Sequence, residues 1–167
     1  MRVFLVGFMG AGKSTTGRAL ARRLGCMFVD LDARISARFG LEVAEIFRRH
    51  GEPVFRAEEA RQLAACGRWA DVVVATGGGT FTAEGNRAVI ADLGVSVFLD
   101  VSWEEITRRL PGKRAERPLF ATPEAALELY RARLPFYRAA DLQVRPGPGE
   151  DAEALAGRLL VLLGERA

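Results

Sequence analysis

The sequence predicts an α/β fold built on a parallel sheet that carries a phosphate-binding loop. The apolar segment Val3 to Val6 leads directly into a glycine-rich loop, Gly7 to Ser14, and a helical pattern follows from Thr15 to Leu24. A continuous apolar run within Asp71 to Thr76 is typical of a strand buried on both faces of a parallel sheet. Predicted strands end in carboxylates or glycines, and in such a sheet these ends line the ligand crevice.

The loop after the first strand, Arg2 to Val6, matches the pattern G-x-x-x-x-G-K-[ST] of a P-loop. Its glycines let amide N–H groups and the positive end of the next helix point at phosphates. We expect Lys13 to reach the β- and γ-phosphates and the Ser14 hydroxyl to bind Mg²⁺. The alternative is a glycine-rich turn without a ligand. The expected nucleotide contacts in this loop are Gly10, Ala11, Gly12, Lys13, Ser14 and Thr15.

Composition favours one globular domain spanning residues 1–167, with 49% apolar and 27% charged residues. No apolar run is long enough to cross a bilayer and no secretory signal is apparent, so we expect a cytoplasmic protein without membrane contact. The two cysteines, Cys26 and Cys66, lack metal-ligand spacing, and we expect both to be small buried apolar side chains.

The formal charge of +3 comes almost entirely from arginine, because Lys13 and Lys113 are the only lysines. Guanidinium groups suit carboxylates and phosphates, which favours anionic small molecules as partners. The arginines alternate with Asp and Glu instead of forming one basic run, so no nucleic-acid surface is predicted.

The predicted strand Met27 to Val29 ends in Asp30-Leu31-Asp32. Carboxylates one residue apart on a strand point to the same side, so one can order Mg²⁺ while the other meets a substrate hydroxyl. The alternative is that Asp32 is only the N-cap of a helix from Ala33 to Phe39.

Two further helices are predicted, from Glu42 to Arg49 and from Gly51 onward, with Pro53 in the first turn of the second. Arg56 on the second helix could hold a substrate carboxylate, or it could form a weak surface ion pair with Glu59. His50 ends the first of these helices and is given no catalytic role.

Three glycines, Gly77, Gly78 and Gly79, follow the strand that ends in Thr76. They predict a backbone close to a ligand, or alternatively a flexible turn. Nucleotide-binding strands at this position usually end in Asp, so here the metal carboxylate has to come from Asp30 or from Asp100, which follows the predicted strand Val95 to Leu99.

The rest of the chain is predicted to contain a helix, a loop, a second helix, a strand and a terminal helix. Basic residues with Pro and Gly at about 111–123 favour a lid that closes over the site. Pro135 is expected to kink or interrupt the second helix. The segments concerned are Trp103 to Leu110, Pro123 to Ala140, Asp141 to Val144, and a final helix with Leu155, Leu159 and Leu162 on one face.

Several motifs occur together in an order that resembles the shikimate kinase family. They are GFMGAGKST, Phe28-Val29-Asp30-Leu31-Asp32, Gly51-Glu52-Pro53-Val54-Phe55-Arg56, Thr76-Gly77-Gly78-Gly79, Arg117-Pro118-Leu119 and Arg133-Leu134-Pro135-Phe136-Tyr137. The resemblance covers nearly the whole chain. It implies a nucleoside-monophosphate-kinase-like fold, with five parallel strands in the order 2-3-1-4-5, helices on both faces and a mobile lid. It also implies transfer of the ATP γ-phosphoryl group to the 3-hydroxyl of shikimate, in aromatic amino acid biosynthesis.

The same resemblance implies a role for individual residues. Asp32 would bind the ring hydroxyls and could accept the proton of the nucleophile, while Arg56 and Arg133 would clamp the substrate carboxylate. The glycines at 77–79 would lie at the substrate, with Gly78 giving an amide. The remaining implied roles are charge stabilisation by Lys13 and Arg117, stacking of Arg109 on adenine, and Mg²⁺ binding by Ser14 and Asp30.

The resemblance also implies a substrate-binding helical region at about 33–61, and we expect a monomer because a lid can exclude water without a partner. A kinase for gluconate or a nucleoside monophosphate would share the P-loop but would not need paired arginines. A GTP switch would need an Asn-Lys-x-Asp motif, and the only asparagine, Asn86, is followed by Arg87-Ala88-Val89.

Overall fold

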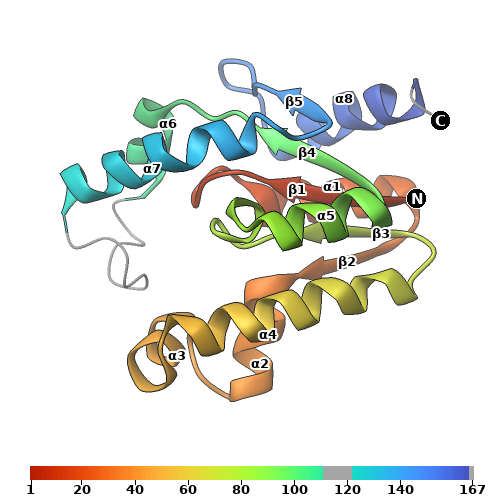
Figure 1. The fold of residues 1–167 in the computed structure, drawn as a ribbon. Coiled ribbons are helices and arrows are strands. Elements are labelled where there is room, and N and C mark those ends of the chain that lie inside the picture. The colour runs from red at the N-terminus through yellow and green to blue at the C-terminus, as the bar shows by residue number, and fades with distance from the viewer. Residues whose placement is uncertain (111–121, 166–167) are drawn as a thin grey trace.

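A five-stranded parallel sheet forms the centre of the molecule, in the order β2-β3-β1-β4-β5 (Figure 1). The computed structural model describes residues 1–110 and 122–165. The observed order is the one that the family resemblance implies. The strands are β1 Arg2–Val6, β2 Met27–Asp30, β3 Val72–Ala75, β4 Val95–Leu99 and β5 Leu142–Val144.

The central strand β1 pairs with β3 on one side and β4 on the other, with Val3 opposite Val73 and Val95. Its residues 3–6 have no exposed surface, which explains the unbroken apolar run in the sequence. Because all strands are parallel, their carboxyl ends meet at one edge of the sheet. The P-loop, Asp30 and the glycines at 77–79 therefore come together there.

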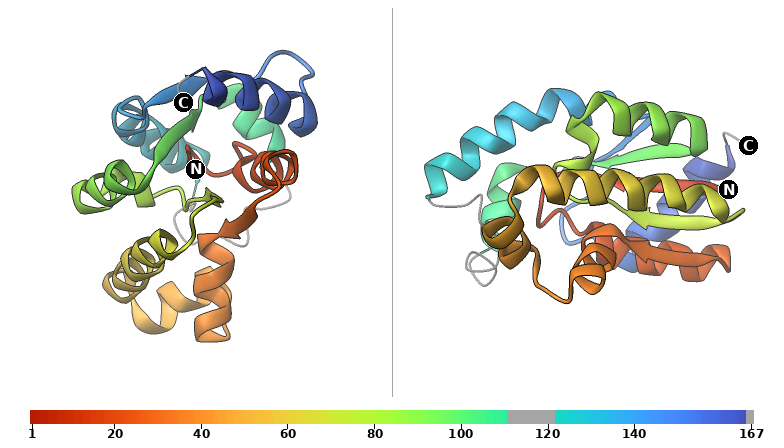
Figure 2. Two further views of the ribbon diagram at one scale, coloured as in Figure 1. Left: turned by 90° about the vertical axis from the view of Figure 1, so that its right-hand side faces the viewer. Right: turned by 60° about the horizontal axis from the view of Figure 1, so that its bottom comes forward.

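Helices cover both faces of the sheet. The helix α1 packs on α8 at one face, while α4 and α5 lie on the other (Figure 2). The helices are α1 Lys13–Leu24, α2 Leu31–Phe39, α3 Val43–His50, α4 Glu52–Ala64, α5 Glu84–Leu93, α6 Trp103–Arg109, α7 Pro123–Tyr137 and α8 Ala152–Gly164. Short 3₁₀ turns η1 and η2 occupy Ala65–Arg68 and Thr80–Thr82.

The helix α5 is not among the predicted elements. It connects β3 to β4, which are parallel and lie on opposite sides of β1, so the chain needs a long crossover between them.

The helices α2, α3 and α4 extend beyond the edge strand β2 and have a small core of their own (Figure 1, lower part). Ile35, Ile46 and Phe55 contribute one buried side chain from each helix. This core is separate from the main cluster on the sheet. It makes the expected substrate-binding region, about 33–61, a distinct projection at the edge of the site.

The structure settles two local alternatives in the helices. The helix α2 begins at Leu31, and the side chain that caps it is that of Asp30, which accepts a hydrogen bond from the Ala33 amide at 3.2 Å. Asp32 therefore lies in the first turn of the helix and is not its N-cap. Pro135 does not end α7, because it lies in the exposed last turn, where the helical carbonyl that loses its donor can reach water.

In α8, Leu155 and Leu159 are buried and Leu162 is partly buried against the same core, as predicted, and Leu163 is buried as well. Cys66 is buried as predicted, and burial raises the pKa of its thiol to about 11. Cys26 is only half-buried, so the prediction for it is only partly right. Among residues 1–110 and 122–165, no helix has both the length and the apolar character to cross a membrane.

Candidate active site

Two pockets adjoin at the carboxyl edge of the sheet. A pocket of about 430 Å³ lies over the P-loop, and one of about 440 Å³ lies between the glycines at 77–79 and the helices α2, α4 and α7. The two pockets share Met9, Asp30, Asp32 and Gly78 in their walls. A molecule bound in one pocket would therefore lie next to a molecule bound in the other.

The P-loop has the backbone of a phosphate cradle. Gly10 and Gly12 have φ angles of 80° and 90°, a conformation that residues with a Cβ rarely adopt. The Lys13 ammonium group, with its side chain only 8% exposed, donates to the carbonyl oxygens of Gly7 and Phe8 at 2.7 and 2.9 Å. These contacts hold the ammonium group inside the loop, and all expected contacts from Gly10 to Thr15 line this pocket.

Ser14 and Asp30 lie together at the floor of the P-loop pocket. The Ser14 hydroxyl donates to Asp30 Oδ2 at 2.5 Å, while Asp30 Oδ1 caps α2. A hydroxyl and a carboxylate are hard oxygen donors of the kind that Mg²⁺ prefers beside phosphates. The pair therefore fits the cation that the sequence predicts.

The rival carboxylate, Asp100, lies elsewhere. It forms an ion pair with Arg145 at 2.6 Å and lines a third cavity, of about 760 Å³, instead of the P-loop pocket. Thr76, at the end of β3, donates its hydroxyl to the Leu5 carbonyl at 3.0 Å. The residue at this strand end, where a metal-binding carboxylate is usual, thus bonds to the backbone of the neighbouring strand instead. Of the two candidate carboxylates, Asp30 is the one that lies in the P-loop pocket.

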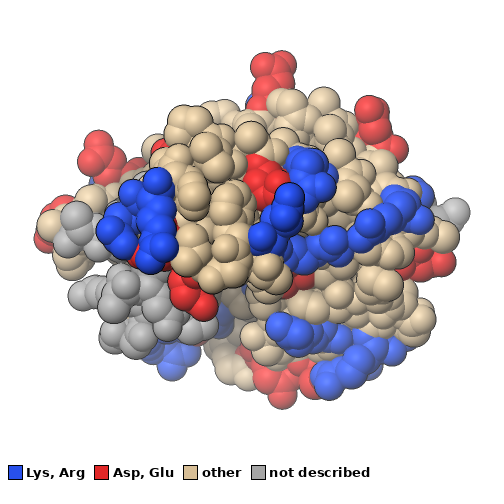
Figure 3. Space-filling model, turned by 90° about the horizontal axis from the view of Figure 1, so that it is seen from below, with Lys and Arg blue, Asp and Glu red and all other residues tan. Residues whose placement is uncertain are grey.

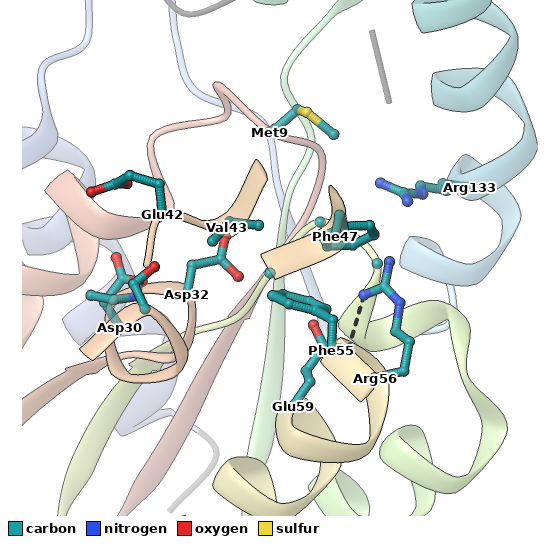
Figure 4. A pocket seen from close by; sticks show the side chains of 15 residues that line it. Met9, Asp30, Asp32, Glu42, Val43, Phe47, Phe55, Arg56, Glu59 and Arg133 are labelled. Atoms are coloured by element: carbon teal, nitrogen blue, oxygen red, sulfur yellow. Dashed lines mark hydrogen bonds and ion pairs between the residues drawn. The ribbon is translucent and has the colours of Figure 1, made fainter. Parts of the chain in front are cut away.

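In the second pocket, an acidic side faces a basic side across aromatic rings (Figure 4). Asp32 lies on one side, Arg56 and Arg133 lie on the other, and the rings of Phe47 and Phe55 lie between them. A small molecule with hydroxyl groups at one end and a carboxylate at the other would match these charges.

The guanidinium group of Arg56 is held by two glutamates and lies close to Gly79. Its Nη1 donates to Glu59 Oε2 at 3.0 Å and its Nε donates to Glu52 Oε1 at 3.2 Å. Burial disfavours the charge of Arg56, but the ion pairs and hydrogen bonds with Glu59 and Glu52 together outweigh it and raise the pKa. A Cβ on Gly79 would lie 2.5 Å from Arg56 Nη2, so only glycine leaves room for this position.

Arg133 is the most unusual cation of the pocket. It is 7% exposed, and its Nη1 is buried with no hydrogen-bond partner among the described residues. Burial lowers the pKa of this guanidinium group. Since an unpaired buried donor is costly, a carboxylate entering the pocket would supply the missing acceptor.

Tyr137 lies one turn after Arg133 on α7 and holds the backbone of Gly78 in place. Its hydroxyl donates to the Gly78 carbonyl at 2.5 Å, its ring stacks on Phe98, and burial raises the pKa of the hydroxyl to about 12. A Cβ on Gly78 would lie 3.2 Å from Arg133 Nη1. The Gly78 backbone is therefore held against the basic side of the pocket.

The structure brings most of the predicted site residues together. Arg109 lies at the border of the P-loop pocket and the third cavity, and its Nε donates to Glu105 at 2.6 Å. Arg117 and most of the expected lid lie outside the described residues. The predicted residues that line the two adjoining pockets are Gly10, Ala11, Gly12, Lys13, Ser14, Thr15, Asp30, Asp32, Arg56, Gly77, Gly78, Gly79, Arg109 and Arg133.

The pocket residues that sequence reasoning missed include Glu59, Phe47 and Phe55. Glu59 was expected only as the partner in a surface ion pair. The pair with Arg56 exists, but Glu59 has no exposed surface. The signal available in the sequence was that Phe55 and Glu59 are four residues apart, which places an aromatic ring and a carboxylate on the same side of α4 as Arg56.

The chain is similar in sequence to several known proteins. Residues 9–163 match the family model for shikimate kinase. The chain is 43% identical to a shikimate kinase of Ruegeria pomeroyi over 98% of this chain and 85% of that protein. It is 48% identical to one of Geobacter sulfurreducens over 85% of this chain and 80% of that protein.

Solved structures give the same result. A shikimate kinase from Acinetobacter baumannii in complex with shikimate has a TM-score of 0.92 and 34% identity, over 99% of this chain and 93% of that one. An APS kinase from Mycobacterium tuberculosis, at 22% identity and a TM-score of 0.62, shares the fold. The family model covers most of the sequence, and relatives above 40% identity are matched over most of their own length, so this chain belongs to the shikimate kinase family.

Proposed function

We propose that this protein transfers the γ-phosphoryl group of ATP to the 3-hydroxyl of shikimate, giving shikimate 3-phosphate and ADP. The observation that carries the proposal is the buried, unpartnered Nη1 of Arg133 beside Arg56, in a pocket that adjoins the P-loop. Shikimate has one carboxylate and three hydroxyl groups on a small ring. These features match the two arginines, Asp32 and the rings of Phe47 and Phe55.

The clamp fixes which end of the substrate faces the nucleotide. With its carboxylate between Arg56 and Arg133, the ring extends toward Asp32, which lines both pockets. The hydroxyl nearest Asp32 is then directed at the P-loop pocket. Holding two reactants in this way removes much of the entropic cost of their encounter.

Asp32 is the group that we assign to the nucleophile. The hydroxyl oxygen forms a bond to the γ-phosphorus while the bond to the β,γ-bridging oxygen breaks, and the hydroxyl proton is lost. The Asp32 carboxylate can accept a hydrogen bond from that hydroxyl and then its proton. Because phosphoryl transfer has a loose transition state, orientation by Asp32 matters at least as much as its basicity.

Lys13 is the cation that we assign to the transferring group. Its ammonium group is already directed into the loop by the carbonyls of Gly7 and Phe8. Charge that builds on the β- and γ-phosphate oxygens would meet this preorganised cation and the amides at the start of α1. We propose that Arg117 adds a second cation from a lid at about 111–123, above the substrate region at about 33–61.

Mg²⁺ belongs to the same proposal. Ser14 and Asp30 would hold it, and when bound it would neutralise part of the phosphate charge. The third cavity, which shares Arg109 and Pro146 with the P-loop pocket, is where we place the base of the nucleotide.

The proposal is tested by measuring ADP release from Mg·ATP with shikimate, the methyl ester of shikimate, gluconate, AMP and no acceptor in parallel. We expect rapid release with shikimate and a much lower kcat/KM with its ester, because the ester lacks the charge that the arginines bind. Equal turnover of acid and ester would contradict the clamp. Release only with gluconate or AMP would contradict the substrate.

A second prediction concerns Asp30. Replacing it by Asn should raise the Mg²⁺ concentration needed for half-maximal activity by about 10-fold or more, because a charged oxygen ligand is lost. Asn is as good an N-cap as Asp, so α2 should remain folded. The measurement is a Mg²⁺ titration at fixed ATP, with Asp92→Asn on the exposed surface of α5 as the control. An unchanged Mg²⁺ requirement would remove Asp30 from the metal site.

A further inference from the structure

Glu59 is completely buried, and its carboxylate accepts hydrogen bonds from two different side chains. Its Oε2 accepts from Arg56 Nη1 at 3.0 Å, and its Oε1 accepts from the Thr80 hydroxyl at 2.6 Å. Glu59 and Thr80 both have 0% exposed surface. A carboxylate removed from water in this way depends on every hydrogen bond that it retains.

Thr80 is itself firmly held. It begins the 3₁₀ turn η2 that follows the three glycines; its amide donates to the Gly77 carbonyl at 3.2 Å, and its own carbonyl accepts from Asn86 Nδ2 at 3.0 Å. Asn86 belongs to α5, on the face of the sheet that also carries α4. The hydroxyl thus occupies a fixed point of the main fold, from which it reaches a residue of the substrate-binding helices.

Little space surrounds the guanidinium group of Arg56, so the position of this group depends on its neighbours. Gly79 approaches the guanidinium group so closely that a Cβ would lie 2.5 Å from Nη2, and the ring centres of Phe55 and Phe47 lie 5.3 and 5.9 Å from the guanidinium carbon. The other acidic partner, Glu52, is half exposed and therefore holds Arg56 only weakly. Glu59 is the partner that can set its orientation.

We propose that Thr80 is a positioning residue for the substrate carboxylate, because its hydroxyl holds Glu59 in the orientation that places Arg56 over Gly79. This inference rests on the proposed function and deepens it. Thr80 is absent from the walls of the pocket and acts only through Glu59 and Arg56. Its hydroxyl links the glycine turn at the end of β3 to the side chain that binds the acid group.

The charges around Glu59 explain why one hydroxyl can matter. Burial raises the pKa of Glu59 above its usual range, Arg56 and Thr80 oppose that rise, and Asp32 adds a smaller upward contribution. Loss of the Thr80 donor favours the protonated form of Glu59 or a rotated carboxylate. In the first case Arg56 loses the anion that holds it, and in the second it loses the fixed direction of that anion.

The test compares Thr80→Val with the wild-type protein on two substrates, shikimate and its methyl ester. We expect Thr80→Val to raise the KM for shikimate about 10-fold, the scale of a lost hydrogen bond to a charged group, and to leave the KM for ATP within about twofold. The ester has no carboxylate, so its kcat/KM should change little. The ratio of kcat/KM for acid over ester should therefore fall about 10-fold, and Thr80→Ser should restore it.

The matched control is Thr82→Val, in the same 3₁₀ turn. The Thr82 hydroxyl donates to the Gly79 carbonyl within the turn at 2.7 Å, and Thr82 is absent from the pocket walls, so its removal should leave the acid-to-ester ratio unchanged. If Thr80→Val does not fold, Thr80→Ala, which also lacks the hydroxyl and is smaller, has to show the same fall in the ratio.

The outcomes separate this inference from the proposed function. Equal losses for acid and ester in Thr80→Val would mean general damage and would overturn the positioning role, as would an unchanged ratio. If the wild-type protein turns over shikimate and Thr80→Val keeps the same acid-to-ester ratio of kcat/KM, the proposed function stands. Only the positioning role of Thr80 is then excluded. A wild-type protein inactive with shikimate removes both.

Discussion

Replacement of Lys13 by Ala is expected to lower turnover at least ~100-fold, in the range seen when one preorganised electrostatic partner is removed. The ammonium group lies inside the P-loop on the carbonyls of Gly7 and Phe8, at the point where charge would build on the phosphate oxygens. The lost interaction strengthens in the transition state, so kcat should fall more than the KM for shikimate rises. Steady-state kinetics with each substrate varied in turn would measure both changes.

A matched control for Lys13 lies on the same helix. Arg22 is exposed at the end of α1 and forms a surface ion pair with Glu153. Arg22→Ala removes one positive charge from α1 without touching either pocket and should leave turnover near the wild-type value. Near-normal turnover of a folded Lys13→Ala protein would contradict the role of Lys13.

The second large effect is expected for Arg56→Ala. Loss of this guanidinium group should raise the KM for shikimate by about 10- to 100-fold, the cost of losing a buried charge-assisted interaction, with little change in the KM for ATP. The methyl ester should be affected much less. Kinetics with both acceptors would give this difference directly.

Arg56→Ala also leaves Glu59 buried without its cation, so we expect the variant to unfold at a lower temperature. The double variant Arg56→Ala, Glu59→Gln removes the uncompensated charge and should regain part of the stability while the KM for shikimate stays high. Arg61→Ala, which breaks the ion pair of the exposed Arg61 side chain with the partly buried Glu58 on the same helix, is the control. An unchanged KM for shikimate in Arg56→Ala would exclude the clamp.

The fold and the phosphate loop could be predicted because their signals are local. An apolar run, glycines at fixed positions and a Lys-Ser pair all fall within a short stretch from Val3 to Ser14. The helix α5 was not predicted, although the position of β1 between β3 and β4 requires a crossover there. The order of the strands came from the family resemblance and not from periodicity.

The substrate pocket was only partly predictable, because burial cannot be read from the spacing of charges. Arginine and glutamate three residues apart occur both on exposed helices and in pockets. Arg48 with Glu45 on α3 is of the first kind, and Arg56 with Glu59 is of the second. Figure 3 shows basic and acidic side chains interspersed on one face of the molecule. The surroundings of two groups, Nη1 of Arg133 and the hydroxyl of Thr80, are set by packing between segments that lie far apart in the sequence. No local sequence pattern could therefore predict them.

The central position of β1 has a consequence for how the chain folds. Both neighbours of this strand lie far along the sequence, since Val3 pairs with Val73 of β3 and with Val95 of β4. During synthesis, both edges of β1 therefore stay unpaired until β3 has been made, and one edge stays unpaired until β4 follows. Contacts between such distant residues slow folding and expose apolar edges to aggregation, so refolding of this protein should be slower than that of a helical bundle of the same length.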